Sequence, residues 1–323
     1  MFSVAPARRF AWLALALSST LALLGTSLAA AQDTSPPAGD TEISSQLPAA
    51  DLPSMNEQGY LFELDSTWSG SFDSVPAEAP VYRMIMPTFD ADSFAAQAAK
   101  FGLEGEVQDL GSGSWEVASD AGSLYAAPGF SQYISTAEVA EGDLPTDEQA
   151  LAFAREWLRQ TGTLPADAGP GMVVERVENP PRVFVAIKPV QPENLLAAYP
   201  SITIVMGPNA QVLEASFRWY DLQVADTYAL LPPTTAWQEV EQRRAFLQAE
   251  IPADVAQPGA TIRGRATYTN VIVSYTTSGL IGENQYLQPV YIFQGNVQLE
   301  GSDQTYKVSA FVPALINSQQ PVG

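Results

Sequence analysis

The sequence predicts an α+β protein built of tandem modules, each with one helix packed on an antiparallel β-meander. Segments with the pattern of capped amphipathic helices recur three times along the chain, and each is followed by several short β-branched and aromatic runs. Turns rich in glycine, proline and asparagine separate these runs, which is typical of strands that pair with their sequence neighbours.

The first two predicted helices have clear start and stop signals. Asp90 or Asp92 caps the first, and Gly102 ends it. In the second, Thr146 and Gln149 have the spacing of a capping box, in which each side chain bonds the other residue's backbone N–H. Their apolar faces are Phe94, Ala98 and Phe101 in the first, and Leu151, Ala154, Trp157 and Leu158 in the second.

The third predicted helix begins with the same box at Thr235 and Gln238, and Pro252 ends it. Its inward-facing residues are Trp237, Val240, Leu247 and Ile251. The predicted strands are 115–117, 123–126 and 132–135, then 172–177, 182–188, 202–206 and 211–219, then 261–275, 286–294 and 305–311. Together these elements divide the chain into modules at 57–141, 142–231 and 232–316, with a tail at 317–323.

The N-terminal 31 residues predict export from the cytoplasm. Arg8 and Arg9 precede an uncharged run rich in leucine and alanine, which ends in three alanines before Gln32. A basic start, an apolar centre and a small-residue end are typical of a secretory signal peptide, here 1–31. The same run is long enough to span a bilayer, so an uncleaved anchor is the alternative. Residues 32–56 have no aromatic residue or periodicity and predict a disordered linker.

The composition excludes several classes of function. The chain has 36 acidic and 15 basic residues, a formal net charge of −21, and neither histidine nor cysteine. These absences remove Ser-His-Asp and Cys-His nucleophile systems, disulfides and the commonest zinc and haem ligands. No cofactor and no metal site are expected. An acidic surface repels nucleic acid and anionic lipid head groups, so neither is an expected partner.

No catalytic residue is predicted, because no residue-level catalytic motif occurs in the sequence. Paired carboxylates remain the main catalytic option, since a glycosidase works with two carboxyl groups that flank a sugar. A secreted carboxylate-dependent hydrolase is therefore the alternative function. Five tryptophans fit either a buried core or a sugar-binding groove: Trp68, Trp115, Trp157, Trp219 and Trp237.

The segment 286–295, which reads YLQPVYIFQG, is the one candidate for a binding site. It predicts a strand of the third module, with Tyr291 and Phe293 on one face and Gln288 on the other. Proline cannot donate a ladder hydrogen bond, so Pro289 favours a strand start, a bulge or an edge. The segment is either a plain structural strand, with both aromatic rings against the third helix, or an edge to which a partner adds a strand. In the first case Gln288→Ala should have little effect on stability.

Residues 143–311 resemble bacterial extracytoplasmic YycH/YycI-type regulatory domains and, more broadly, PepSY-type modules. The order and spacing of five stretches carry this resemblance: 148–151 opening a helix, the strand pair 202–206 and 212–219, 228–230 leading into Ala236-Trp237, 286–291, and 306–310. The resemblance implies a non-enzymatic protein that contacts a membrane sensor kinase, a protease or an envelope component. Those regulators are membrane-anchored, whereas the three alanines before Gln32 indicate release from the membrane.

We therefore expect a secreted or surface-tethered, non-enzymatic binding or regulatory protein of the bacterial envelope. Its partner is expected to be an envelope protein, such as a sensor kinase or a protease, or a cell-wall component. Gln288, Tyr291 and Phe293 are the candidate binding residues.

Overall fold

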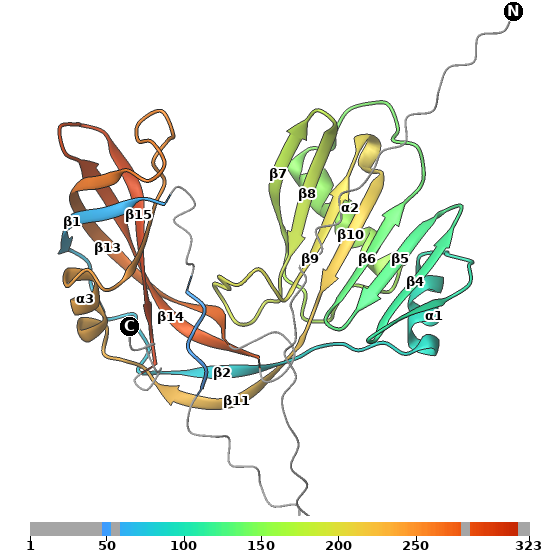
Figure 1. Cartoon of the computed structure of the whole chain (residues 1–323), viewed down its shortest axis with the longest axis horizontal. Coiled ribbons are helices and arrows are strands. Elements are labelled where there is room, and N and C mark those ends of the chain that lie inside the picture. Colours follow the sequence, from blue (N-terminus) through green and yellow to red (C-terminus); the bar gives the residue numbers. More distant parts are fainter. Residues whose placement is uncertain (1–46, 53–58, 279–284, 316–323) are drawn as a thin grey trace, which may run out of the picture. The chain divides into compact units, whose positions relative to one another are not determined.

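A computed structural model of the 323-residue chain describes residues 47–52, 59–278 and 285–315. The predicted signal segment 1–31, most of the predicted linker and the tail 317–323 lie outside the described residues. The described part holds two β-sheets, one of seven strands and one of eight, together with three α-helices (Figure 1). None of those helices is long and apolar enough to cross a membrane.

The eight-stranded sheet is a continuous antiparallel ladder in the order β3-β4-β5-β6-β10-β9-β8-β7. Its two four-strand runs each follow a helix in the chain, and they join where β6 pairs with β10. Its elements are α1 (Ala91–Lys100), β3 (Gln108–Gly111), β4 (Ser114–Ser119), β5 (Gly122–Ala127), β6 (Phe130–Ser135), α2 (Asp147–Gln160), β7 (Met172–Glu178), β8 (Pro181–Ile187), β9 (Ser201–Met206), the 3₁₀ turn η1 (Pro208–Ala210) and β10 (Val212–Arg218).

The seven-stranded sheet joins the two ends of the described chain. β1 lies parallel to β13, with Leu61 opposite Thr261, and β2 pairs with both β11 and β14. In Figure 1 the blue β1 therefore lies beside the orange β13. Its elements are β1 (Leu61–Trp68), β2 (Glu78–Ile85), β11 (Asp221–Ala229), α3 (Pro233–Glu241), β12 (Phe246–Ala249), β13 (Thr261–Ser278), β14 (Tyr286–Leu299) and β15 (Thr305–Pro313).

The prediction of tandem helix-plus-meander modules is wrong. The strand runs that follow α1 and α2 do not stay in separate modules but merge into one eight-stranded sheet, and the remaining strands form a seven-stranded sheet, so the described protein is mostly β. Strands from 57–141 and from 232–316 share the seven-stranded sheet, through the β1–β13 and β2–β14 pairs. The physical reason is that β1 and β2 cover edges of β13 and β14 that would otherwise leave backbone groups unpaired.

The capping signals of the first two helices are confirmed. Asp90 caps α1 in a capping box with Ser93, and Thr146 caps α2 in a reciprocal box with Gln149. Gly162, which follows α2, has a φ of 61°, a left-handed conformation that glycine adopts without steric cost.

The prediction for the third helix is wrong in length and in its cap. α3 begins at Pro233 without a side-chain cap and ends at Glu241, and Arg243 has a φ of 60°. Leu247 lies in β12, opposite Ala310 of β15, instead of on the helix. The proline at the first turn sets an earlier start, and pairing with β15 takes the residues that would have extended the helix.

The seven-stranded sheet holds the largest buried cluster. Trp237 and Val240 of α3 pack there against Tyr291 and Phe293 of β14. All residues of β14 from Tyr286 to Phe293 are buried, so both of its faces are covered there.

Candidate functional site

The predicted binding segment 286–295 lies inside the seven-stranded sheet. β14 pairs with β13 along its length, and on its other side with β2 at Tyr286 and Leu287 and with β15 from Val290 onward. The edge placement is therefore wrong. Pro289 lies where the neighbour changes from β2 to β15, so its missing N–H leaves no gap in a continuous ladder.

The three candidate residues are fully buried. Tyr291 donates a hydrogen bond to the Leu231 carbonyl at 2.7 Å, and burial raises the pKa of its hydroxyl to about 12. The Phe293 ring lies 5.5 Å from that of Trp237, which confirms the expected packing on α3. Gln288 donates to the Pro48 carbonyl at 2.7 Å and to the Ser278 hydroxyl at 2.5 Å. No external partner reaches these side chains in this conformation.

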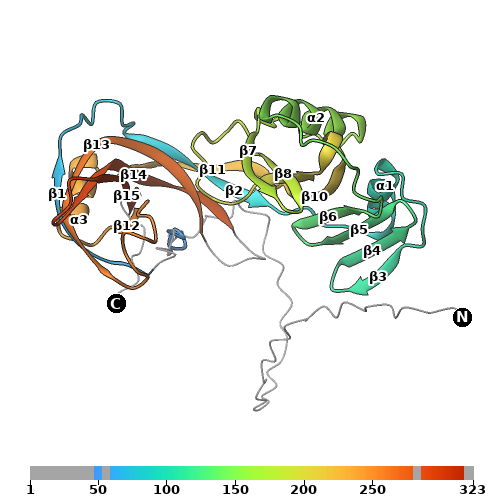
Figure 2. The ribbon, with the colours of Figure 1, turned by 90° about the horizontal axis from the view of Figure 1, so that it is seen from above.

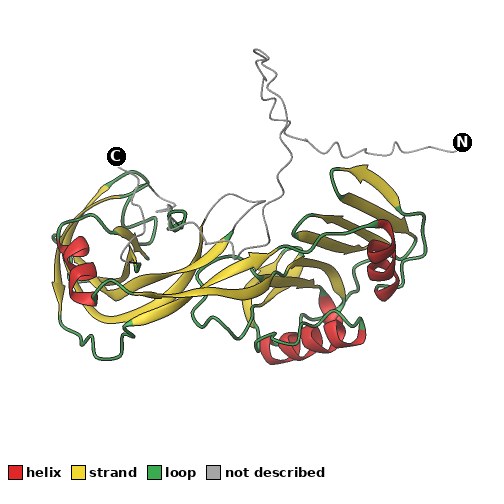
Figure 3. Ribbon diagram, turned by 90° about the horizontal axis from the view of Figure 1, so that it is seen from below, coloured by secondary structure: helices red, strands yellow, loops and turns green. Residues whose placement is uncertain are grey.

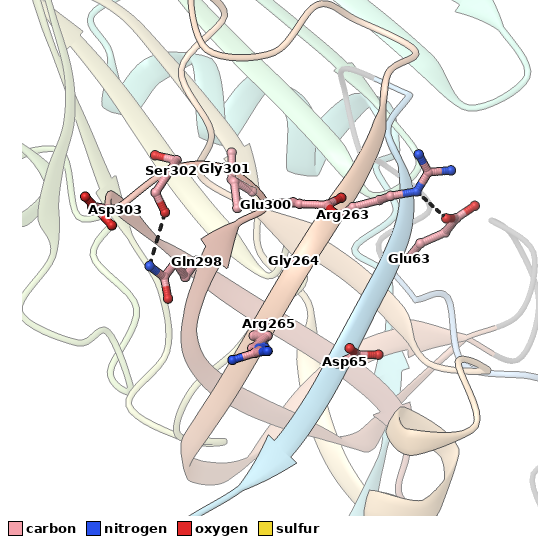
Figure 4. A pocket seen from close by; sticks show the side chains of 11 residues that line it. Glu63, Asp65, Arg263, Gly264, Arg265, Gln298, Glu300, Gly301, Ser302 and Asp303 are labelled. Carbon is pink, nitrogen blue, oxygen red and sulfur yellow. Dashed lines mark hydrogen bonds and ion pairs between the residues drawn. The ribbon is translucent and has the colours of Figure 1, made fainter.

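A polar groove of about 530 Å³ lies on the outer surface of the seven-stranded sheet (Figure 4). Its acidic side chains are Glu63, Asp65, Glu300 and Asp303, and its basic side chains are Arg263 and Arg265. The parallel register of β1 and β13 places Glu63 opposite Arg263 and Asp65 opposite Arg265. This register sets each acidic side chain of β1 opposite a basic side chain of β13, 200 residues away in sequence.

Ion pairs engage two of the four acids in the polar groove. Arg263 Nε donates to Glu63 Oε2 at 2.7 Å, and Arg243 Nη2 lies 3.6 Å from Asp65 Oδ1. A general acid of a glycosidase needs a raised pKa. Two carboxyl groups elsewhere have a lowered pKa instead: Asp90, through its hydrogen bonds with Ser93, and Glu239, through its hydrogen bond from Arg244.

A second cavity, of about 560 Å³, opens between α1 and the loop after α2, on the helix-covered side of the eight-stranded sheet. Apolar side chains that include Phe89, Leu164 and Phe217 line it, and Lys100 donates to the Gly162 carbonyl at 3.4 Å. Within the described residues, no three His, Cys, Asp or Glu side chains are grouped as metal ligands would be.

Among the described residues, helices pack on only one face of the eight-stranded sheet. α1 and α2 both pack on that face, against residues such as Val117 and Leu124 for α1, and Val185 and Ile204 for α2. Figures 2 and 3 show both helices on the same side of this sheet. α3 belongs to the core of the seven-stranded sheet. The helix-free side therefore presents eight adjacent strands.

We define the open face as the outward side chains near the centre of this helix-free side. They are Glu116, Tyr125, Phe130, Gln132, Ile134, Thr203, Glu214, Ser216 and Arg218. Strand register places them in rows: Glu116, Tyr125, Gln132, Ser216 and Thr203 follow one another across β4, β5, β6, β10 and β9. All five of these remain partly exposed, and Ile134 in the neighbouring row is 44% exposed.

Two interacting groups organise the open face. The Arg218 guanidinium carbon lies 5.3 Å from the centre of the Phe130 ring, which lies 6.3 Å from the Tyr125 ring. Beside them, Gln132 donates to Glu214 Oε1 at 2.7 Å, and Ser216 donates to the same oxygen at 3.3 Å. Contacts within β10 and between β5, β6 and β10 hold these side chains in place. The face thus combines a pre-positioned cation, two rings and a hydrogen-bonded carboxylate.

The sequence reasoning missed the open face. The signal was present in 122–127 and 130–135, where alternate positions point to opposite faces of a strand. One set, which includes Leu124, Ala126 and Tyr133, faces the helices, whereas the other includes Tyr125, Phe130, Gln132 and Ile134. Long or aromatic side chains on the solvent side of adjacent strands mark a surface that strand assignment alone does not reveal.

No protein-family model matches the sequence, and no curated protein matches it. Similar solved structures include an uncharacterized protein from Eubacterium rectale, with a TM-score of 0.46, 10% identity and coverage of 81% of this chain and 91% of that chain. Another is the C-terminal domain of YpeB from Bacillus megaterium, with a TM-score of 0.37, 9% identity and coverage of 71% and 94%. No family model supports the YycH/YycI-type resemblance specifically.

Proposed function

We propose that this chain is an exported, non-enzymatic binding protein of the bacterial envelope, and that it meets a protein partner through the open face. The observation that carries the proposal is the Arg218–Phe130–Tyr125 group, which lies beside the Glu214 hydrogen-bond network on a helix-free sheet. Aromatic and arginine side chains are enriched at the energetic centres of protein interfaces.

The chemistry of the open face favours a protein surface over a small ligand. The side chains lie side by side on a sheet and do not converge in an enclosed pocket, whereas small-molecule sites are concave. Arg218 offers a planar donor for a partner carboxylate, and its guanidinium is pre-oriented by the Phe130 ring. Glu214 accepts two internal hydrogen bonds and retains acceptor capacity for a partner donor.

Export and the identity of the partner are part of the proposal. The signal-peptide pattern of 1–31 supports export, and the absence of cysteine is compatible with any redox compartment. A sensor kinase or a protease of the envelope is the expected kind of partner, and a cell-wall component is the alternative. The alternative of a carboxylate-dependent hydrolase has less support, because arginines already engage Glu63 and Asp65 in the polar groove.

Site-specific photo-crosslinking in the producing cell tests the proposal. A benzophenone amino acid at Ile134 samples the open face, and one at Phe153, which is 50% exposed on α2, is the control on the helix-covered side. We expect one discrete crosslinked protein from position 134, none from position 153, and loss of the product when Arg218→Glu is added. Equal products from both positions, or a product that survives Arg218→Glu, would contradict the open-face assignment.

A further inference from the structure

Three separate segments of the chain cover the edge of β13 that faces away from β14. β14 pairs with β13 throughout, but β1 covers the other edge only as far as Tyr268. Beyond it, Tyr275 exchanges backbone hydrogen bonds with the loop after β8: its N–H donates to Asn194 O at 3.3 Å, and its carbonyl accepts from Leu196 N at 2.8 Å. The last residues of the strand, 276–278, meet the N-terminal segment 47–52.

Residues 47–52 bind the end of β13 mainly through their backbone. Ala50 forms an antiparallel bridge with Ser278, and Asp51 N donates to the Thr277 carbonyl at 2.7 Å. Thr276 Oγ1 donates to the Asp51 carbonyl at 2.6 Å, and Thr277 Oγ1 donates to the Asp51 carboxylate at 3.1 Å. The segment therefore adds a short strand to the sheet, and its one charged side chain meets a hydroxyl donor.

This end of the β13–β14 hairpin is built of buried polar side chains. Six of the eight buried polar residues in the described part of the chain gather here: Ser274, Thr276, Thr277, Ser278, Gln285 and Gln288. Two of them have a buried side-chain oxygen, Gln285 Oε1 and Gln288 Oε1, that accepts no hydrogen bond among the described residues. Buried acceptors are normally satisfied, so these two offer positions for N–H donors that residues 47–52 do not supply.

We propose that residues 276–278, together with Gln285 and Gln288, form a binding site for an extended peptide segment of a partner protein, and that residues 47–52 are its resident competitor. The fitting peptide pairs its backbone with β13, places a small residue opposite Ser278 and puts a carboxylate next to Thr277. Its additional N–H groups reach the two free glutamine oxygens. This is strand addition at a sheet edge, and it does not depend on the open face.

The extent of pairing shows why residues 47–52 are displaceable. β1 pairs with β13 over eight residues, whereas the resident segment forms one ladder bridge and is otherwise held by side-chain hydrogen bonds to Asp51 and Pro48. Short, sparsely bonded segments open locally at low free-energy cost. With a resident competitor, the apparent affinity for a partner equals the intrinsic affinity multiplied by the fraction of time for which the site is vacant.

A locked variant tests where the peptide binds. Ala50 and Ser278 form a non-hydrogen-bonded antiparallel pair, the pair type with the closer side chains, and the chain has no cysteine of its own. The probe is a fluorescein-labelled peptide with the sequence of residues 47–52, measured by anisotropy against the full chain. We expect oxidised Ala50→Cys/Ser278→Cys protein to lose binding and reduction to restore it, with Ser278→Cys alone as the control.

A released variant tests competition and remains informative if the disulfide does not form. Asp51→Pro removes the N–H that donates to the Thr277 carbonyl. Ala49→Pro is the control, because Ala49 is exposed and its N–H makes no hydrogen bond with residues 276–278. We expect Asp51→Pro to bind the peptide at least tenfold more tightly than Ala49→Pro, with binding lost on adding Thr277→Val. The proposal would be overturned if Asp51→Pro and Ala49→Pro bound the peptide with equal affinity, or if the locked protein bound it as well as the reduced protein does. A disulfide that joins two chains would also overturn it and would assign the site to a second copy of this chain.

Discussion

Phe293→Ala should strongly destabilise the seven-stranded sheet. The Phe293 ring is fully buried, and its centre lies 5.5 Å from the Trp237 ring, 5.8 Å from Trp68 and 6.1 Å from Tyr291. Removing a buried phenylalanine ring costs about 3–5 kcal/mol. We expect the upper half of that range, because the neighbouring rings come from α3, β1 and β14 and cannot all move into the space.

The predicted loss is large compared with the stability of a domain, which is about 5–15 kcal/mol. At roughly 2–4 °C per kcal/mol for a protein of this size, a loss in the upper half of that range should lower the midpoint of thermal unfolding by roughly 8–20 °C. Urea unfolding followed by tryptophan fluorescence measures the free energy directly, since Trp68 and Trp237 both lie beside the deleted ring.

The control for this measurement is Phe153→Ala. Phe153 is 50% exposed on α2, so its removal should change the free energy of unfolding by about 0.5 kcal/mol or less. A Phe293→Ala loss below about 1 kcal/mol, or one equal to that of Phe153→Ala, would refute the placement of β14 as an inner strand.

Three further predictions follow from the same structure. Gln288→Ala should cost about 1–3 kcal/mol in urea unfolding, because it removes the buried donor to Pro48 and Ser278; a neutral result would favour the sequence-based expectation instead. Burial raises the pKa of Tyr291 to about 12 against about 10 in the unfolded chain, so its contribution to stability is complete below pH 10 and is lost as the pH rises toward 12. Thermal melts from pH 8 to 11.5 should therefore decline less steeply for Tyr291→Phe than for the unmodified protein, and parallel declines would contradict this. Intact-mass analysis of exported protein should find Gln32 at the N-terminus, and retention of residues 1–31 would support an anchor.

Local signals in the sequence predicted local structure well. The cap predicted at Asp90 or Asp92 and the box predicted at Thr146 depend on residues within one helical turn; α1 begins after Asp90 and α2 after Thr146. The same reasoning failed at Thr235, where Pro233 begins the helix earlier and β15 recruits Phe246–Ala249 as a strand. The β1–β13 pair lies beyond such reasoning altogether, because its partners are 200 residues apart and neither strand encodes the other in its own pattern.

The candidate sites were less predictable than the helices. Tyr291 and Phe293 lie in an aromatic, β-branched segment that is compatible with a binding edge. The same composition suits an inner strand, which is where they lie. The open face depends on β6 meeting β10, which brings Gln132 to Glu214 across 82 residues of sequence. The site at the end of β13 depends on a six-residue segment from a region that composition alone assigned to a disordered linker.

Hydroxyl-radical footprinting of the open face tests the proposed function most directly. It compares the oxidation of individual side chains in the purified protein with that in the protein within its native envelope. We predict that Tyr125 and Phe130 lose reactivity in the envelope, whereas Phe153 on α2 and Phe246 on β12, which are exposed outside the open face, react equally in both states. Equal oxidation of Tyr125 and Phe130 in both states, or protection confined to Phe153, would contradict a function exercised through the open face.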